Sequence, residues 1–297
     1  MKKIITILLI VILSSCLRID DMAFLNDNSI TEYLLDDYKG ETELVLPSQY
    51  DIADDMLTFV SFESKLEGES EPKAIAGLYI GELDSIFTDT IILYCHGQTD
   101  HMDYYWARAK LLANCGGKNR YGVLMFDYRG YGLSEGSPSE DGMNADVSAA
   151  LNWLKQHAAK NKQVIIYGFS LGSAPATYAA AFYDDFKPNK LILESPFSSA
   201  ENLTQESTMI NVQAEFLTDL KLENAEMIKD VDQAFMWFHG VEDDYIAISN
   251  GELIYNNYKG IYKEAHPVEG AKHGKDGVPQ TLGFDEYLDI VNDFIER

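Results

Sequence analysis

Four short, almost wholly apolar runs in the middle of the chain constrain its fold most strongly. They cover residues 91–95, 123–126, 164–167 and 191–193, and a segment with helix-like patterning follows each of them. A strand that is apolar on both faces has to be covered on both faces, and intervening helices let successive strands run parallel. The pattern therefore predicts an α/β fold with a mostly parallel central sheet between two layers of helices.

Further elements extend this pattern toward both ends of the chain. The predicted elements are alternating strands at 57–63 and 73–80, later strands at 235–238 and 261–268, and amphipathic helices at 29–39 and 284–296. The 297 residues are 46% hydrophobic, which suffices for one large core, so we expect one folded domain rather than two.

The charge of the chain excludes one class of partner. The sequence has 48 acidic and 23 basic residues, a formal net charge of −25. Without a basic patch to displace counterions from phosphates, we expect no nucleic-acid partner, and a solvated surface explains the acidity better than a charge-specific role. No Gly-x-Gly-x-x-Gly follows the first strand and no metal-ligand spacing is present, so we expect neither a cofactor nor a metal.

The N-terminus carries a targeting signal. A short basic region, residues 1–3, precedes ten apolar residues at 4–13, too few to span a bilayer, which indicates a signal peptide. The sequence Leu-Ser-Ser-Cys16 resembles a bacterial lipobox. The resemblance implies cleavage after residue 15, lipidation of Cys16 and attachment to a membrane of the bacterial cell envelope, outside the cytoplasm. An ordinary secretory signal is the alternative.

Two other cysteines remain, and neither is predicted to do chemistry. Cys95 ends an apolar run, whereas Cys115 follows a helix that leads back toward the opposite end of the sheet. A disulfide needs Cα atoms within about 7 Å, so we expect two buried free thiols. Neither cysteine has the Gly-x-Cys-x-Gly frame of a nucleophile.

One serine is placed as nucleophilic catalysis requires. The apolar run 164–167 leads into Gly168-Phe-Ser170-Leu-Gly172, and a stretch of small residues with helical character follows. A tight strand-to-helix turn lifts a serine hydroxyl clear of the backbone and presents it to a base. Side chains two residues before and after that serine would collide in the turn, which explains both glycines. We therefore predict that Ser170 is a nucleophile.

Further landmarks follow the order found in a known family. They are His96-Gly97, residues 126–136 (Phe-Asp-Tyr-Arg-Gly-Tyr-Gly-Leu-Ser-Glu-Gly), the Ser170 turn, 194–197 (Glu-Ser-Pro-Phe), 239–243 (His-Gly-Val-Glu-Asp) and 270–273 (Gly-Ala-Lys-His). From about residue 57 onward the chain resembles the α/β-hydrolase superfamily, in its compact serine-aminopeptidase-like branch. The resemblance implies the α/β-hydrolase fold and a Ser, acid, His triad.

The resemblance also assigns the base and the acid. The family's base follows the last strand, which leaves His266 and His273; His266 lies within the strand pattern and suits a structural role, so His273 is the expected base. The family pattern His-Gly-x-x-Asp places the acid at Asp243, with Asp244 as the alternative and neighbouring Glu242 expected to be solvated.

Two backbone N–H groups must stabilise the oxyanion that forms on the attacked carbonyl. In this fold the residue after the nucleophile supplies one, here Leu171, and the loop after the third strand supplies the other, by resemblance Gln98. We expect His96 and His239 to form structural hydrogen bonds. For Arg129, a structural Asp–Arg pair is favoured over a binding site for an anionic substrate.

These predictions define a domain plan: a signal peptide at 1–15, a tether with a short helix at 16–40, and an α/β-hydrolase domain at 41–297 with a small cap-like insertion at 198–231. The expected reaction is hydrolysis of a carboxylic ester through an acyl-enzyme, on a small acyl-ester, lipid or peptide substrate. The alternatives are a peptidase or amidase with the same triad, and a non-catalytic surface-binding lipoprotein.

The sequence also suggests side chains for an acyl pocket. The candidates are Met209, Phe216, Leu217, Phe169 and the Tyr104-Tyr105-Trp106 cluster. Ordinary core packing is the favoured explanation for each of them.

Overall fold

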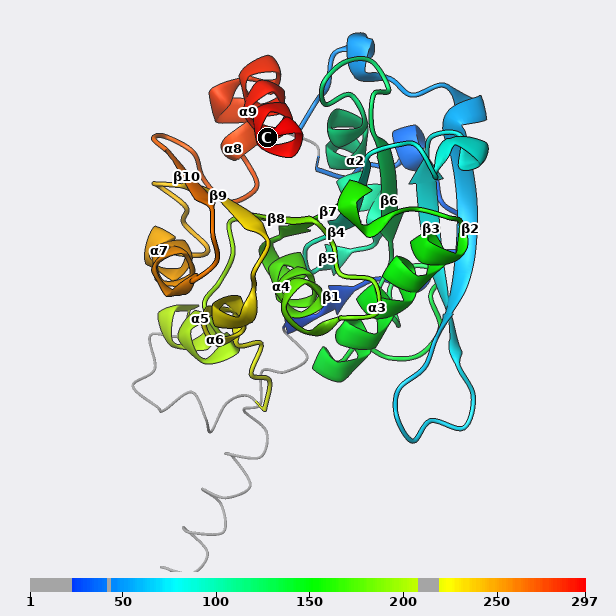
Figure 1. The fold of residues 1–297 in the computed structure, drawn as a ribbon, viewed down its shortest axis with the longest axis horizontal. Coiled ribbons are helices and arrows are strands. Elements are labelled where there is room, and N and C mark those ends of the chain that lie inside the picture. Colours follow the sequence, from blue (N-terminus) through cyan, green and yellow to red (C-terminus); the bar gives the residue numbers. More distant parts are fainter. Residues whose placement is uncertain (1–22, 42–43, 208–218) are drawn as a thin grey trace, which may run out of the picture.

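The computed structural model describes residues 23–41, 44–207 and 219–297, and it is built around an eight-stranded sheet of order β10-β9-β8-β7-β4-β6-β3-β2 (Figure 1). All neighbouring strands are parallel except the antiparallel pairs β2–β3 and β3–β6. The strands are β2 (Leu57–Ser64), β3 (Lys73–Ile80), β4 (Ile91–Cys95), β6 (Gly122–Phe126), β7 (Val164–Phe169), β8 (Lys190–Glu194), β9 (Ala234–Gly240) and β10 (Lys263–Val268).

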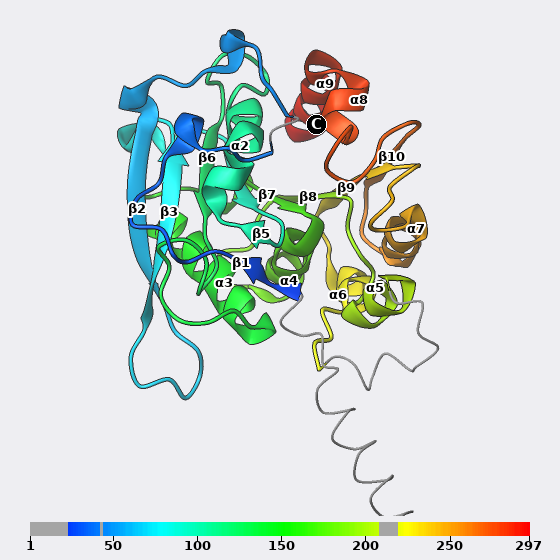
Figure 2. The same cartoon turned by 180° about the vertical axis from the view of Figure 1, so that it is seen from behind.

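Helices cover both faces of the sheet, as Figures 1 and 2 show from opposite sides. Alternate strand residues enter different cores: Ile92 and Tyr94 of β4 pack in one, Leu93 and Cys95 in the other. The first core includes residues of α2 (Trp106–Ala113), α8 (Val278–Leu282) and α9 (Phe284–Glu296). The second includes residues of α3 (Glu140–Gln156), α4 (Ser173–Phe182), α5 (Ala200–Ser207), α6 (Asn224–Met227) and α7 (Ile248–Asn257).

The predicted fold class, a mostly parallel sheet between helices, is confirmed. Every residue of the four central apolar strands is buried, which is why their sequences are continuous in apolar character rather than alternating. The closing helix has the predicted bounds, and the strand predicted from residue 261 begins at Lys263. Cys95 and Cys115 are buried free thiols, as predicted.

The N-terminal segment differs from its prediction. The helix expected at 29–39 is wrong, because the structure has only the short 3-10 helix η2 (Leu35–Asp37) there. The segment is also no free tether: β1 (Leu25–Asn26) pairs with β5 (Thr99–Asp100). The main-chain N–H groups of Leu34 and Leu35 donate to the Asp103 carboxylate at 2.7 and 3.0 Å. The main-chain N–H groups of this segment thus bond to the rest of the domain instead of forming the hydrogen bonds of a helix.

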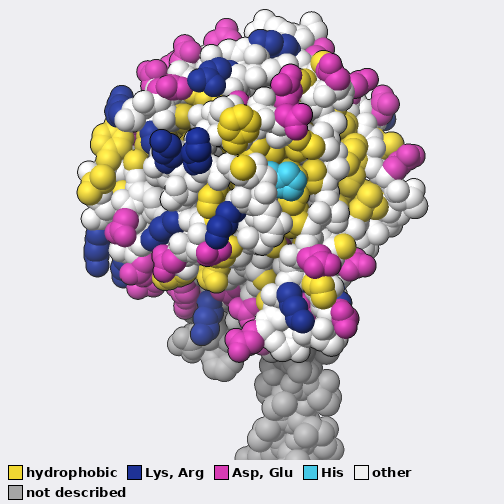
Figure 3. All heavy atoms as spheres, turned by 45° about the vertical axis from the view of Figure 1, so that its right-hand side comes forward, with side chains coloured by type: hydrophobic (Ala, Val, Ile, Leu, Met, Phe, Trp, Pro, Cys, Tyr) yellow, Lys and Arg dark blue, Asp and Glu magenta, His cyan; other side chains and the backbone are white. Residues whose placement is uncertain are grey.

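Several predicted features lie outside the described residues: the signal peptide at 1–15, Cys16, and Met209, Phe216 and Leu217 of the insertion. The described part of the insertion contains α5, α6 and the 3-10 helix η10 (Ile228–Asp230). Within the described ranges, no helix has the length and apolar character needed to cross a membrane. Figure 3 shows acidic and basic side chains interspersed over one face, with apolar side chains exposed between them.

Candidate active site

The turn after β7 holds Ser170 in a strained conformation. Its φ is +52°, in the left-handed region that L-residues rarely adopt, and the residue is 4% exposed. The helix α4 begins three residues later, so the strand passes directly into a helix. A Cβ on Gly172 would lie 2.0 Å from the carbonyl oxygen of Cys95, and one on Gly168 would lie 2.5 Å from that of Gly172. Both positions therefore require glycine, as the sequence indicates.

The loop after β10 brings His273 to this serine. Its Nε2 lies 2.9 Å from Ser170 Oγ, and its Nδ1 lies 2.9 Å from Asp243 Oδ2. The ring stacks on Phe169, with a centroid separation of 5.3 Å. The three residues predicted as a triad, from three distant parts of the sequence, thus form one continuous hydrogen-bonded chain. By contrast, His266 lies on β10, where its Nε2 is 3.1 Å from Glu264.

The turn after β9 fixes the Asp243 carboxylate. Its Oδ1 accepts the main-chain N–H groups of Tyr245 and Ile246 at 3.0 and 2.7 Å, which leaves Oδ2 facing His273. The Asp243 side chain is fully buried, whereas neighbouring Asp244 is exposed. Burial alone would raise the pKa of Asp243, but hydrogen bonds from His239 and His273 outweigh it and hold the pKa well below its usual value.

The hydrogen bonds of His239 define its tautomer. The indole N–H of Trp237 donates to its Nδ1 at 3.2 Å, so Nε2 carries the proton and faces the Ile246 carbonyl at 2.9 Å. This Nε2 is also 3.5 Å from Asp243 Oδ2. His239 and His273 therefore approach the same carboxylate oxygen of Asp243, His239 at the longer distance.

His96 also lies beside the site without joining the hydrogen-bonded chain. Its Nε2 lies 3.1 Å from Asp127 Oδ1, and its ring packs on Tyr128 at a centroid separation of 4.5 Å. Asp127 in turn accepts the main-chain N–H of Met102 and the hydroxyl of Tyr33, both at 2.7 Å. The contacts of His96 are those of a residue that shapes the loops after β4 and β6.

Leu171 and Gln98, the residues predicted to supply the oxyanion donors, both lie close to Ser170. Leu171 follows the serine directly, and the loop that carries Gln98 leaves β4 beside the end of β7, where Cys95 pairs with Gly168. Among the main-chain hydrogen bonds of the described residues outside helices and strands, none is donated by the N–H of Leu171 or Gln98.

A pocket of about 210 Å³ opens above Ser170. It is lined by Glu41, Gln98, Thr99, Tyr104, Tyr105, Phe169, Ser170, Tyr245, His273 and Gly274. Of the candidate acyl-pocket side chains, Phe169, Tyr104 and Tyr105 line this pocket. Trp106 instead lines a neighbouring cavity, which shares Glu41 and Tyr104 with the pocket. Glu41 was not singled out by the sequence, because it lies in an irregular segment without a motif.

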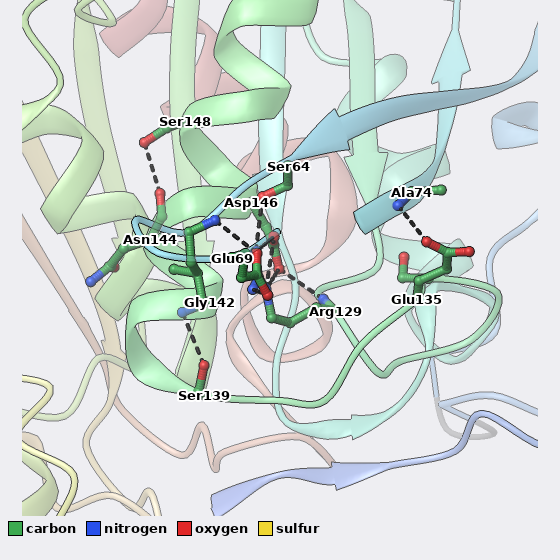
Figure 4. A network of polar contacts seen from close by, with 12 residues as sticks. Ser64, Glu69, Ala74, Arg129, Glu135, Ser139, Gly142, Asn144, Asp146 and Ser148 are labelled. Carbon is green, nitrogen blue, oxygen red and sulfur yellow. Dashed lines mark hydrogen bonds and ion pairs between the residues drawn. The ribbon is translucent and has the colours of Figure 1, made fainter. Parts of the chain in front are cut away.

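Arg129 lies in a structural network, shown in Figure 4. Its guanidinium bonds Asp146 of α3 at 2.9 Å and Ser64 of β2 at 3.0 Å, and it reaches Glu69 at 3.3 Å. Burial raises the pKa of Asp146 against the opposing effect of Arg129. The favoured interpretation, a structural pair, accounts for these contacts, and the acid comes from α3 rather than from the Arg129 loop itself.

Among the residues that the structure describes, no group of three or more His, Cys, Asp or Glu side chains is arranged to hold a metal ion.

Known proteins resemble the chain in sequence and in fold. Lysophosphatidylserine lipase ABHD12 from Xenopus tropicalis is 31% identical over 208 residues, covering 62% of this chain and 53% of that protein. Protein bem46 from Schizosaccharomyces pombe is 26% identical over 207 residues, covering 69% and 66%. The chain thus spans about half the length of the lipase. The solved structure of Pyrococcus furiosus esterase Pf2001 has a TM-score of 0.65 at 16% identity, covering 92% of this chain and 98% of that one.

A family model described as alpha/beta hydrolase fold matches residues 90–246, from the strand before the Gln98 loop to the turn that carries Asp243. This match covers more than half of the sequence and agrees with the observed sheet and turn. The protein belongs to the alpha/beta hydrolase family.

Proposed function

We propose that the protein is a serine hydrolase that cleaves carboxylic esters through an acyl-enzyme. The observation that carries this proposal is the hydrogen-bonded chain from Ser170 through His273 to Asp243, with 2.9 Å at each of its two contacts. The strained φ of Ser170 adds support, because strain of this kind is characteristic of a nucleophile turn.

Each residue has a defined part in the first half of the reaction. Ser170 Oγ attacks the ester carbonyl carbon while His273 Nε2 takes the hydroxyl proton. Asp243 accepts the Nδ1 proton of His273, which fixes the tautomer and stabilises the imidazolium. The N–H groups of Leu171 and Gln98 donate hydrogen bonds to the carbonyl oxygen and stabilise the negative charge that develops on it.

The second half of the reaction returns the enzyme to its starting state. His273 gives its proton to the departing alkoxide, so the alcohol leaves and the acyl group stays on Ser170. His273 then takes a proton from water, which attacks the acyl carbon, and collapse of the tetrahedral adduct releases the acid and restores the Ser170 hydroxyl.

Similar proteins favour ester hydrolysis over amide hydrolysis. The chain is similar in sequence to a lysophosphatidylserine lipase and similar in fold to an esterase. Small acyl esters and lipid esters are thus the proposed substrates. A peptidase or amidase would use the same triad, and a binding lipoprotein would keep the fold without turnover.

A fluorescent fluorophosphonate tests the mechanism on the full-length protein. Wild type should be labelled, whereas Ser170→Ala and His273→Ala should not. His266→Ala is the matched control, because His266 lies outside the pocket, and it should label like wild type. A folded wild-type protein that takes no label would contradict the serine-hydrolase mechanism and favour the binding-protein alternative.

We further propose that the protein lies at the bacterial cell envelope, attached to the membrane through lipidated Cys16. The support is the Leu-Ser-Ser-Cys sequence after a short basic and apolar leader. Growth with a palmitate analogue should label wild type but not Cys16→Ser, and an unlabelled wild type would exclude the lipid anchor.

A further inference from the structure

The active-site pocket contains one carboxylate that the proposed mechanism does not use. Among the described residues that line the pocket, Glu41 is the only acidic side chain, and no lysine or arginine lines it. Its Oε1 lies 3.9 Å from the point where a Cβ on Gly274 would stand, beside the proposed base His273. The carboxylate is thus within the space that a substrate must enter.

The position of Glu41 is fixed rather than incidental. Nε and Nη2 of Arg108 donate to its two oxygens at 2.7 and 3.1 Å, and its main-chain N–H donates to the Tyr104 carbonyl at 3.1 Å. Preceding Gly40 lies so close to Tyr104 that a Cβ would be 2.5 Å from the same carbonyl oxygen. The N-terminal segment therefore delivers this carboxylate into the pocket in a defined orientation.

The arginine does not neutralise the acids around it. Arg108 also donates to Glu194 through Nη1 at 2.8 Å, and the side chains of Arg108 and Glu194 are 4% and 1% exposed. Glu194 also accepts the hydroxyl of Tyr167, so the carboxylate is held by two partners. One guanidinium shared by two carboxylates leaves an excess of one negative charge beneath the pocket, where low solvent access weakens screening.

From this arrangement we infer that Glu41 makes the pocket selective for esters that carry a cationic ammonium group near the scissile bond. The inference rests on the proposed esterase function. A carboxylate in the substrate would face the excess negative charge, whereas an ammonium group would balance it. A pocket of about 210 Å³ suits a short substituent of this kind better than a long acyl chain.

The ammonium group can belong to the alcohol or to the acyl part of the ester. Acetylcholine and its uncharged carbon isostere test the alcohol side, and glycine ethyl ester and ethyl propanoate test the acyl side. The quantity measured is the cation preference, the ratio of kcat/KM for the charged ester to that for its neutral partner. Comparing this ratio between protein variants cancels the intrinsic reactivities of the two esters.

The decisive variant is Glu41→Gln in the full chain, which keeps an oxygen for Arg108 and leaves Arg108 paired with Glu194. Its cation preference should fall at least about fivefold at low salt for one of the two ester pairs. The control Glu63→Gln removes an exposed acid of the edge strand β2 and should keep the wild-type ratio. Circular dichroism and thermal unfolding verify that both variants are folded.

The outcomes separate this inference from the function on which it rests. Hydrolysis of the neutral esters with the same ratio in wild type and folded Glu41→Gln would overturn the role of Glu41 alone. No hydrolysis of any ester, together with no fluorophosphonate labelling of Ser170, would overturn both. A preference that falls equally in Glu63→Gln would show a general surface effect and would also overturn the role of Glu41.

Discussion

The side-chain amide of Gln98 donates a 2.7 Å hydrogen bond to the hydroxyl of Tyr245, joining the loop after β4 to the turn that carries Asp243. The main chain of Gln98 is a proposed oxyanion donor, so this bond holds that donor in place. We expect Tyr245→Phe to lower kcat/KM for esters by about fivefold, because preorganised donors contribute strongly to catalysis. The free energy of unfolding should change by about 1 kcal/mol or less in this variant, because Tyr245 is 44% exposed.

A double-mutant cycle checks this assignment. Gln98→Ala should cause a similar loss, and the double variant should lose no more than either single variant, because both changes break the same bond. Losses that multiply would show that Tyr245 acts independently of Gln98, for instance through its ring, 5.1 Å from that of His273.

Replacement of the buried acid should reduce turnover far more than replacement of its neighbour. Asp243→Asn presents an amide to His273 Nδ1 and favours the wrong tautomer, so we expect kcat to fall by about 10³–10⁴. Exposed Asp244→Asn should retain activity within about twofold, as expected of a surface substitution. Steady-state kinetics on one ester decides this, and equal losses would contradict the assignment of the acid.

The backbone strain at Ser170 should appear in stability. Ser170→Gly and Ser170→Ala both lose the bond to His273, so their difference reports mainly on the φ of +52°. We expect the glycine variant to be more stable by about 1 kcal/mol in urea unfolding. As a control, Ala149→Gly within helix α3 should lower the free energy of unfolding by about 1 kcal/mol, because there glycine is less stable than alanine. An alanine variant as stable as the glycine variant would contradict strain at this position.

The close packing of the turn makes a further stability prediction. A Cβ on Gly172 would lie 2.0 Å from a main-chain oxygen that cannot move away, so we expect Gly172→Ala to cost about 4 kcal/mol or more. Gly68 differs in both respects, because its φ is positive, +88°, whereas that of Gly172 is −61°, and nothing lies within 4 Å of a Cβ on Gly68. Gly68→Ala should therefore cost only about 1–2 kcal/mol. Soluble yield and urea unfolding midpoints of the two variants measure these losses of stability. Similar losses in both variants would contradict the predicted clash at Gly172.

The sheet could be predicted because its signal is local: continuous apolar runs form strands buried on both faces. The same holds for the turn at Ser170, whose glycines are required by contacts only two residues away. The segment 29–39 has helix-like periodicity, yet the Asp103 carboxylate captures two of its N–H groups and Tyr33 stacks on Phe59 at 5.6 Å. These tertiary contacts override the local helical preference of the segment, and the hydrophobic pattern of the sequence does not reveal them.

The lining of the pocket was less predictable than the catalytic triad. The family resemblance assigned the Ser170, Asp243 and His273 positions, because their motifs are short and ordered along the chain. Glu41 is held at the pocket by Arg108, which binds its carboxylate, and by Tyr104, which accepts its main-chain N–H, and both partners are distant in sequence. No periodicity or motif encodes that contact, so a pairing of this kind becomes visible only in three dimensions.

The lowered pKa of Asp243 predicts how stability depends on pH. An acid whose pKa is lower in the folded than in the unfolded chain stabilises the fold above the unfolded value, about 3.9, and loses that contribution as pH falls through the folded value. Each unit of lowering corresponds to about 1.4 kcal/mol. The stability difference between wild type and Asp243→Asn should therefore be constant near neutral pH and shrink below about pH 4. Urea unfolding of both proteins across this range measures it, with exposed Asp244→Asn as the control. A difference that stays constant into acid would mean that the Asp243 carboxylate gains no net stabilisation from its partners in the fold.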